Sequence, residues 1–307
     1  MSNITQIDGK IHSRTIEINI AEHCNLACES CAHFSPVTKK RFYPPEQLRR
    51  NLNILAKSMS IEYVEFLGGE PLLHPNIGEL AQIVVESGIT DKIKIVTNGV
   101  LLPKMDAAFW ESIHEVSVSE YPGHRLEGDE LAHCVEMART HGVKLEILHH
   151  THFRRIYAEK GTEDQKLIKR IFDSCQIAHT WNCYTLWEDH FFKCPQTVFM
   201  QIALDPKAEI VDGIKVIDNP GFHEQLVQYL EAPHPLEFCK YCLGSAGKLF
   251  PHREIRKHDL WHKENQYTVE EYLDREHLEV LESESPDETS HCFTRSVYEA
   301  DEAATTS

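Results

Sequence analysis

Residues 15–31 read T-I-E-I-N-I-A-E-H-C-N-L-A-C-E-S-C, and this stretch decides how the rest of the chain is interpreted. Its first six residues alternate between polar and apolar side chains and include several β-branched ones, which predicts a β-strand. Cys24, Cys28 and Cys31 follow that strand with the spacing C-x3-C-x2-C. Three thiolates on one short loop can bind a soft metal centre, so the loop is a candidate metal site.

The spacing of these cysteines fits more than one kind of site. A zinc ion would need a fourth ligand, which His23 or His33 could supply. An iron–sulfur cubane with three protein ligands would leave one iron open to a substrate or cofactor. Buried unpaired thiols are a further alternative. Spacing alone leaves this choice open.

The segments after the cysteine loop alternate between strand-like and helix-like patterns. Strands are predicted at residues 63–67, 92–96, 115–119 and 144–149, and helices at 46–58, 76–87, from about 103, 127–141, 162–173 and 222–231. Asn76 and Gly88 are expected to cap the second of these helices. Repeated strand–loop–helix order predicts parallel strands in an α/β fold. A partial (β/α)6 TIM-like barrel fits best, with its chemistry at the carboxyl ends of the strands.

Two further motifs stand at these predicted strand ends. G-G-E-P occupies residues 68–71 after the second strand, and T-N-G occupies residues 97–99 after the third. Alone, G-G-E-P would be interpreted as a simple turn. Together with the cysteine loop, the motifs resemble the radical S-adenosylmethionine (SAM) superfamily. In that family, three cysteines hold a [4Fe–4S] cluster whose open iron chelates SAM, and reductive cleavage of SAM gives a 5′-deoxyadenosyl radical.

The resemblance implies a role for each matching residue. Cys24, Cys28 and Cys31 would hold the cluster. Cofactor contacts would come from Gly68, Gly69 and Glu70 at the methionine amine, from Thr97 and Asn98 nearby, and from Ser117 or Ser119 at the ribose. The electron donor would be a flavodoxin or a ferredoxin.

Other residues resemble a particular subgroup of that family. The run C-N-L-A-C-E-S-C-A-H-F-S-P at residues 24–36 and S-E-Y-P at residues 119–122 are similar to those of members that modify carbohydrates and antibiotic sugars. Ser30 departs from many members, which carry an aromatic residue near the adenine at that position. The subgroup implies a small sugar-type substrate.

A second group of cysteines follows the predicted barrel, at positions 175, 183, 194, 239 and 242. Their spacing would suit a structural zinc site. Their order also resembles the auxiliary-cluster (twitch) domain of 2-deoxy-scyllo-inosamine dehydrogenase. The resemblance implies that Cys175, Cys194, Cys239 and Cys242 hold a second [4Fe–4S] cluster, with Cys183 left over or exchanging roles with Cys175. The predicted domains are a barrel at 12–174, a twitch domain at 175–250 and an extension at 251–307, whose residues 282–307 are predicted to be a mobile acidic tail.

Hydrogen abstraction from a carbinol carbon of a sugar, aminoglycoside or nucleoside-sugar has three possible outcomes. We favour epimerisation, as in neomycin epimerase, with Cys183 as the thiol that returns a hydrogen atom; Cys134 is expected to be structural and Cys292 exposed. Oxidation to a ketone or decarboxylation of a sugar acid are alternatives.

H-H-T-H-F-R-R at residues 149–155 is a polar stretch after the fifth predicted strand. We interpret it as a solvated basic loop, and substrate binding by this loop is the alternative. A zinc-stabilised interaction protein would explain the cysteines but not the other two motifs.

Composition narrows the partners further. The 307 residues carry 31 Lys and Arg against 48 Asp and Glu, a net charge of -17. This balance argues against binding to nucleic acid or to an anionic membrane. No segment has the apolar length of a membrane span, and the first residues lack the pattern of a signal peptide. Ten cysteines without that signal predict a cytoplasmic protein with metal-bound thiols rather than disulfides.

Overall fold

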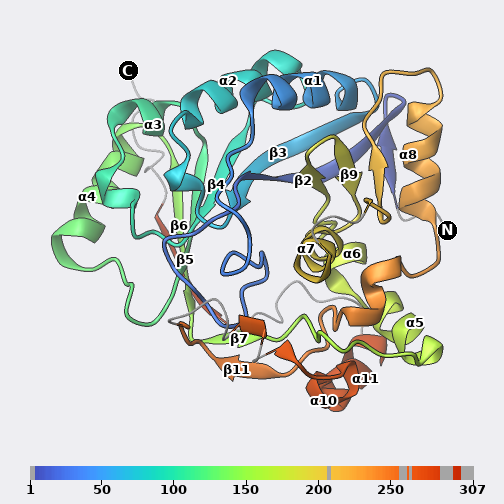
Figure 1. Ribbon diagram of the computed structural model, residues 1–307. Helices are drawn as coiled ribbons and strands as arrows, with labels where there is room; N and C mark the ends of the chain where they lie inside the picture. Colours follow the sequence, from blue (N-terminus) through green and yellow to red (C-terminus); the bar gives the residue numbers. More distant parts are fainter. Residues whose placement is uncertain (1–3, 206–208, 256–260, 263–264, 284–292, 299–307) are drawn as a thin grey trace.

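The computed structural model describes residues 4–205, 209–255, 261–262, 265–283 and 293–298. Five strands in chain order form the centre of one sheet (Figure 1). They are β2 (Lys10–Ala21), β3 (Met59–Gly68), β4 (Ile93–Thr97), β5 (Glu115–Glu120) and β6 (Lys144–His150). Each is parallel to the next. This parallel sheet with its connecting helices confirms the predicted α/β fold.

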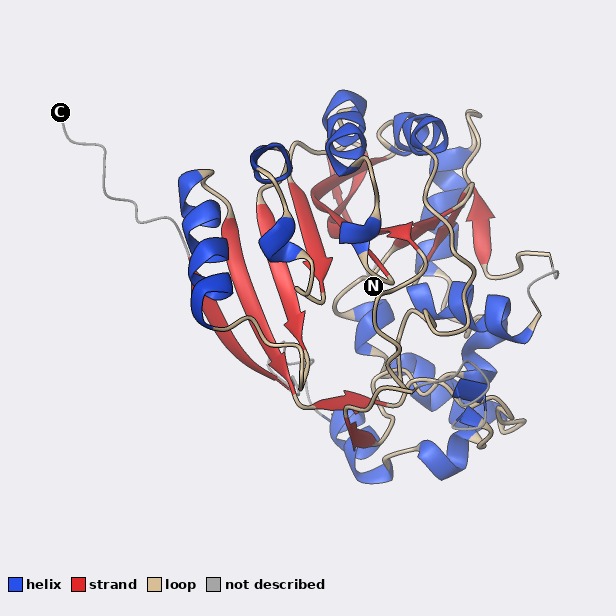
Figure 2. Cartoon of the chain, turned by 60° about the vertical axis from the view of Figure 1, so that its left-hand side comes forward, coloured by secondary structure: helices blue, strands red, loops and turns tan. Residues whose placement is uncertain are grey.

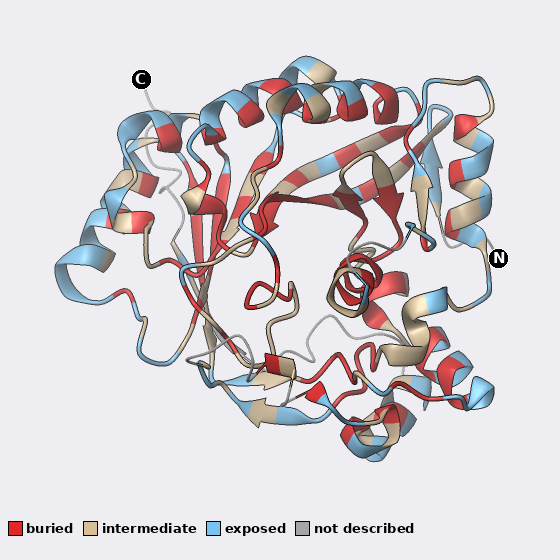
Figure 3. Cartoon of the chain, in the orientation of Figure 1, coloured by how far each residue is buried: buried red, intermediate tan, exposed pale blue. Residues whose placement is uncertain are grey.

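Four helices cover the outer face of this sheet (Figures 1 and 2). They are α1 (Pro45–Leu55), α2 (Ile77–Ser87), α3 (Ala107–Glu111) and α4 (Gly128–Thr140). Ile16, Ile18 and Ile20 of β2 are fully buried in the same core as Leu48 and Leu52 of α1 (Figure 3). Burying each of these side chains contributes about 1.5–3 kcal/mol. The alternation of β2 therefore fixes which face of the strand the helices cover.

Charged side chains occupy the other face of the strands. Glu17 pairs in register with Glu65, Glu65 with Lys94, Lys94 with Glu115, and Glu115 with Lys144. Lys94 Nζ lies 3.2 Å from a carboxylate oxygen of Glu65 and 3.4 Å from one of Glu115. The inner face of the barrel therefore carries a row of ionisable side chains across five strands, in which Glu65, Lys94, Glu115 and Lys144 form ion pairs and Glu17 stands next to a second glutamate.

One predicted helix start and one predicted capping bond differ from the structure. Gly88 adopts the left-handed conformation (φ 71°) that ends α2, as predicted. Asn76 precedes α2, but its side chain makes no capping hydrogen bond and instead lies 3.3 Å from Glu79. The helix expected from about residue 103 is replaced by the short turn η2 (Leu102–Lys104) and by α3, because Asp106 accepts the N–H of Phe109 and starts the helix there.

The sheet continues past the boundary predicted at residue 175. The strand β8 (Thr185–Trp187) is parallel to β2, and β9 (His190–Phe192) and β10 (Gly213–Lys215) extend it antiparallel. Around these strands lie α5 (Gln165–Asp173), α6 (Gln176–His179), α7 (Pro195–Leu204), α8 (Phe222–Glu231) and η3 (Glu237–Tyr241). The second cysteine group is thereby attached directly to the edge of the barrel.

A small second sheet closes the opposite side of the molecule. It pairs β7 (His152–Arg154) with β11 (Leu249–Pro251), next to α10 (Val269–Tyr272) and α11 (Arg275–Ser283). In Figure 1 these elements lie across from α1 and α2, and the blue loop that follows β2 lies between them. The remaining elements are β1 (Thr5–Ile7), which pairs with β2, and η1 (Pro71–Leu73).

Part of the predicted mobile tail is a strand. Residues 293–298 form β12 (Phe293–Tyr298), which pairs antiparallel with β6 through six residue pairs. The tail prediction is therefore wrong for these residues, because an open sheet edge gives them backbone partners. The rest of the tail after residue 283 lies outside the described residues. In the described part of the chain, no helix is both long and apolar enough to cross a membrane.

Candidate active site

The first cysteine loop leaves the carboxyl end of β2. Cys28 is buried, and Cys24 and Cys31 are partly exposed. Cys24 Sγ accepts the backbone N–H of Leu26 at 3.3 Å and lies 3.5 Å from the amide nitrogen of Asn98. Burial, with a contribution from Cys31, raises the pKa of Cys24 to about 12, and burial and the two neighbouring thiols raise the pKa of Cys28. The three sulfurs therefore lie close enough to influence one another.

The two glycines at the end of β3 hold the base of this loop. Gly68 has a φ of +136°, and a Cβ on it would lie 2.1 Å from the carbonyl oxygen of Ala21. A Cβ on Gly69 would lie 2.3 Å from the carbonyl oxygen of His23. Gly69 N–H donates to Ala21 and Glu70 N–H donates to His23. The motif thus lets the backbone of β3 pack directly against the start of the cysteine loop.

Glu70 connects the second motif to the third. Its carboxylate is fully buried and accepts hydrogen bonds from the N–H of Leu72 (3.0 Å), the hydroxyl of Thr97 (2.6 Å) and the N–H of Asn98 (2.9 Å). Burial raises the pKa of Glu70, and these hydrogen bonds oppose that effect. Both carboxylate oxygens therefore have partners within the protein, in the wall behind the cavity described next.

One cavity of about 380 Å³ brings most of the predicted residues together. Its lining includes Cys24, Cys28, Cys31, Gly68, Gly69, Thr97, Asn98 and Ser119. Two predicted cofactor contacts, Glu70 and Ser117, are not among the described residues of that lining. The hydroxyl of Ser117 donates to Glu146 at 3.2 Å inside the barrel. Of the two serines predicted for the ribose, the structure therefore brings only Ser119 to the cavity.

The second cysteine group comes together from three separate segments. Cys175 precedes α6, Cys194 precedes α7, and Cys239 and Cys242 lie in and after η3. Burial is the main cause that raises the pKa of each of the four thiols. Neighbouring cysteines of the group raise the pKa of Cys194, Cys239 and Cys242 further, and Cys175 contributes to all three. The cysteines predicted for the auxiliary cluster are therefore neighbours in space although up to 67 positions separate them.

Backbone N–H groups point at these sulfurs. Cys175 Sγ accepts hydrogen bonds from the backbone of Ile177, Ala178 and Ser245, and Cys242 Sγ accepts the N–H of Gly244 at 3.2 Å. Such donors stabilise thiolates, which are the form that an iron–sulfur cluster requires. Among the described residues, no three Cys, His, Asp or Glu side chains are already arranged as ligands of a single metal ion. The donor chemistry of both cysteine groups fits iron–sulfur ligation.

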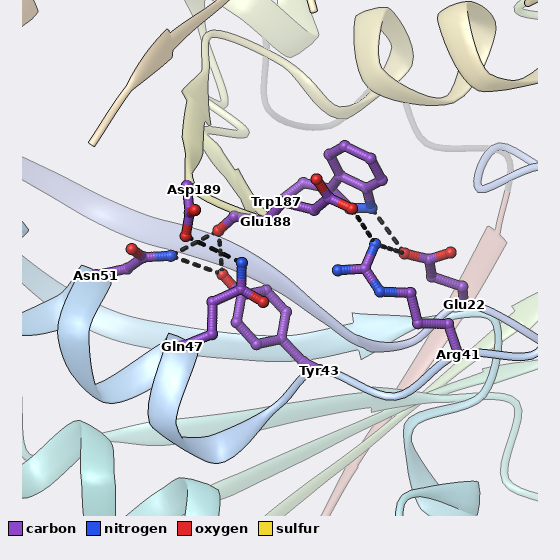
Figure 4. Close-up of polar contacts among 8 residues, drawn as sticks. All are labelled: Glu22, Arg41, Tyr43, Gln47, Asn51, Trp187, Glu188 and Asp189. Carbon is purple, nitrogen blue, oxygen red and sulfur yellow. Dashed lines mark hydrogen bonds and ion pairs between the residues drawn. The ribbon is translucent and has the colours of Figure 1, made fainter. Parts of the chain in front are cut away.

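A hairpin fixes the position of Cys194. Its turn, Glu188 and Asp189, lies between β8 and β9 and is held by residues next to and within α1 (Figure 4). Tyr43 Oη and Asn51 Nδ2 donate to the carbonyl oxygen of Glu188 at 2.6 and 2.5 Å, and Arg41 pairs with the Glu188 carboxylate at 2.6 Å. The barrel wall thus anchors the hairpin that leads to one cysteine of the second group.

Residues 18–119 match the family model of the radical SAM superfamily. They include the whole first cysteine loop and both motifs at the strand ends. This third of the chain therefore resembles a radical SAM domain. The cavity described above lies between this cysteine loop and the two motifs.

The similarity to curated proteins covers only part of this chain. A GTP 3′,8-cyclase of Chlorobaculum tepidum is 33% identical over 105 residues, 34% of this chain and 32% of that enzyme. An S-adenosylmethionine-dependent nucleotide dehydratase of a Thermoplasmatales archaeon is 27% identical over 148 residues, 44% of this chain and 51% of that enzyme. The chain thus spans about a third to a half of the length of these relatives.

Solved structures give partial matches. BtrN in complex with AdoMet and 2-DOIA matches over 75% of this chain and 92% of its own, with a TM-score of 0.43 and 16% identity. The enzyme anSMEcpe with bound AdoMet matches over 44% of this chain and 43% of its own, with a TM-score of 0.36 and 20% identity.

Cys183 is left over from the cysteines predicted for the auxiliary cluster, although it lies near enough to Cys194 for that thiol to contribute to its raised pKa. Its side chain hydrogen-bonds to Glu17 on the inner face of β2, and burial raises its pKa well above the usual value. Burial also raises the pKa of Glu17 to about 8. Cys183 is not among the described residues that line the cavity. Cys134 is buried in α4, as expected, and Cys292 lies outside the described residues.

The stretch 149–155 is not the solvated loop that was expected. It ends β6 and forms β7, whose backbone pairs with β11. His150, His152 and Arg154 line the cavity. His149 contacts Glu120 at 2.5 Å, and Arg155 is buried against Glu29 at 2.8 Å. The stretch therefore contributes to the cavity wall and to its support.

The cavity also contains residues that sequence analysis missed. Gln176, Trp181, Ser245 and His277 line it beside the second cysteine group. Ser245 stands in L-G-S-A-G directly after Cys242, a glycine-rich run that could have indicated a special backbone. No pattern in the sequence indicates His277. It lies in α11, the last described helix, and reaches the cavity only because this helix packs against the rest of the protein.

Proposed function

We propose that this chain is a radical SAM enzyme with two [4Fe–4S] clusters that oxidises a carbinol of a small sugar-type molecule to a ketone. The observation that supports this most is the placement of the cavity. Its lining joins the first cysteine loop to Gln176, Ile177, Gly244 and Ser245, which adjoin Cys175 and Cys242 of the second group. A substrate in this cavity would have one cysteine group on each side.

Each cysteine group would hold one cluster. Cys24, Cys28 and Cys31 would bind the cluster that carries SAM, and Cys175, Cys194, Cys239 and Cys242 would bind the auxiliary one. When bound, the first cluster and SAM supply the radical that removes a hydrogen atom, and the second cluster supplies a place for one electron. A flavodoxin or ferredoxin would serve as the electron donor.

The protein's own side chains would handle the remaining proton. Converting a carbinol to a ketone releases two hydrogens, and the one on oxygen must leave as a proton to a nearby base. His150, His152 and His277 all line the cavity and provide such bases. The aromatic side chains of Tyr121, Phe153 and Trp181 in the same wall would limit access of water to the reacting carbon.

Epimerisation is the second candidate, and it depends on a thiol. It requires a cysteine that returns a hydrogen atom to the substrate, and Cys183 was predicted for that role. The thiol of Cys183 contacts Glu17 on the inner face of β2 and is not among the described residues that line the cavity. Ketone formation needs no such thiol and therefore has the stronger support from geometry. Decarboxylation of a sugar acid stays a prediction.

Product analysis distinguishes these reactions. The protein is reconstituted anaerobically and incubated in D2O with SAM, reductant and a panel of sugars, aminocyclitols and nucleoside-sugars. We expect 5′-deoxyadenosine and a product lighter by two hydrogen atoms, made equally well by Cys183→Ala. A product of unchanged mass apart from one deuterium, absent with Cys183→Ala, would favour the epimerase. A colourless protein that holds zinc instead of iron would support the zinc-stabilised interaction protein.

A further inference from the structure

A segment from the far end of the chain lies along the first cysteine loop. Cys28 and Glu254 form an antiparallel bridge. On either side of it, Glu29 N–H donates to Arg253 at 2.9 Å and Ile255 N–H donates to Ala27 at 2.8 Å. The middle of the cysteine loop is therefore paired, like a short strand, with residues that follow β11.

This pairing brings His252 to Cys28. His252 Nε2 lies 3.2 Å from Cys28 Sγ, within hydrogen-bond distance for sulfur. The imidazole stacks on Tyr121 with 4.8 Å between ring centroids and 7° between planes, and Phe153 packs edge-on at 5.0 Å. Its backbone N–H donates to Thr151 at 3.0 Å. Two rings and one backbone bond therefore hold the imidazole in the orientation that aims Nε2 at the sulfur.

The direction of this contact has a redox consequence. When Cys28 is a thiolate ligand its sulfur can only accept, so His252 must carry its hydrogen on Nε2. A hydrogen bond to a cysteine sulfur stabilises negative charge on the cluster that it binds. The reduced state of a cluster is more negative by one electron than the oxidised state. The hydrogen bond therefore stabilises the reduced state more and raises the reduction potential.

We propose that His252 is a positioning residue that donates an Nε2–H hydrogen bond to the Cys28 thiolate and raises the reduction potential of the SAM-binding cluster. This inference rests on the proposed binding of that cluster by Cys24, Cys28 and Cys31. It assigns a function to a residue outside the radical SAM match of residues 18–119. The C-terminal part of the chain would thereby set how readily the first cluster accepts an electron.

The test is a redox titration of the full-length, reconstituted protein followed by electron paramagnetic resonance. The signal of the first cluster is identified as the one that changes when SAM is added. His252→Leu removes the donor at similar size, and His252→Gln keeps an N–H that can reach the sulfur. His124→Leu is the matched control, because His124 contacts Glu254 of the same segment at 2.6 Å without touching a cysteine.

We expect a lower potential for the first cluster in His252→Leu, a smaller shift in His252→Gln and none in His124→Leu, with equal iron per chain in all four proteins. The auxiliary cluster should keep its potential. Unchanged potential in His252→Leu would overturn the inference, and so would a loss of iron, which would make His252 a ligand. A wild-type protein without a SAM-sensitive signal would overturn the proposed function itself.

Discussion

The two cysteine groups reach similar chemistry in different ways. The first is one loop of eight residues from Cys24 to Cys31, in which Cys28 is buried and the other two cysteines are partly exposed. The second gathers Cys175, Cys194 and the pair Cys239 and Cys242 from three segments, and backbone N–H groups already point at two of its sulfurs. Local sequence encodes the first site, whereas tertiary structure encodes the second. Loss of metal should therefore disturb activity at the first group and folding at the second.

The largest difference is expected in SAM cleavage. Replacing Cys24, Cys28 and Cys31 together by Ala should reduce 5′-deoxyadenosine formation to background, because no other residues would hold the cluster that binds SAM. About half of the iron should stay bound, since the second group is separate. Chromatographic assay of 5′-deoxyadenosine together with iron analysis checks both points. Cleavage at the wild-type rate would contradict the assignment of the first loop.

The free energy of unfolding should change more when cysteines of the second group are replaced than when those of the first loop are. Cys239→Ser with Cys242→Ser removes two ligands of the proposed second site, and losing a metal site ranks among the most destabilising changes. We expect a loss of about 2–3 kcal/mol, or about 3–5 °C in unfolding midpoint at this chain length. The triple Ala variant of the first loop should shift the midpoint by less, as measured by circular dichroism under anaerobic conditions. Equal shifts would mean that the two groups do not differ as described.

The glycines at the end of β3 allow a sharper test of the first loop. A Cβ on Gly69 would collide with the carbonyl of His23 at 2.3 Å, so Gly69→Ala should displace the cysteine loop. We expect iron at the first site to fall severalfold. Gly78→Ala is the control, because a Cβ there would meet only Ser112 at 4.0 Å and the residue lies in α2, where Ala is favoured. Full iron content in Gly69→Ala would show that the loop does not depend on this close packing.

A smaller effect is expected at Glu70. Glu70→Gln turns an acceptor of the Asn98 N–H into a donor, which should cost about 1.5–3 kcal/mol of stability. Because the carboxylate lies behind the cavity wall, SAM affinity should change much less than stability. Titration of SAM into the reconstituted variant, beside its unfolding curve, separates the two effects. Strong loss of SAM affinity with normal stability would instead place Glu70 at the methionine amine.

The last effect depends on pH and concerns the carboxyl group of Glu17, which lies beside Cys183. The pKa of Glu17 is raised to about 8, chiefly by burial, from the ordinary value of 4.5. Between these values the folded state binds more protons than the unfolded one, so this group's contribution to stability falls as pH rises from about 4.5 to 8. Glu17→Gln should flatten that part of the stability curve, and an unchanged slope would contradict the shift.

Sequence analysis was strongest where neighbours along the chain are also neighbours in space. The cysteine loop, G-G-E-P and T-N-G each follow a strand, and strand ends in a parallel sheet meet at one edge, so their convergence could be expected. It could not show that Glu70 accepts three hydrogen bonds behind the cavity wall, because the same motif can face a ligand or buttress a turn. It also could not foresee His252 or His277, since neither lies in a motif and both arrive through packing of the C-terminal part.

The pairing of β12 with β6 has a consequence for how the protein behaves at high concentration. A parallel sheet that ends at β6 would present a row of bare amide and carbonyl groups, to which a strand of another molecule can attach. Six residue pairs with β12 occupy that row. Molecules shortened before residue 293 would expose it, and we expect them to self-associate and precipitate sooner than the full-length chain. Residues beyond the radical SAM match would thus keep the molecules apart.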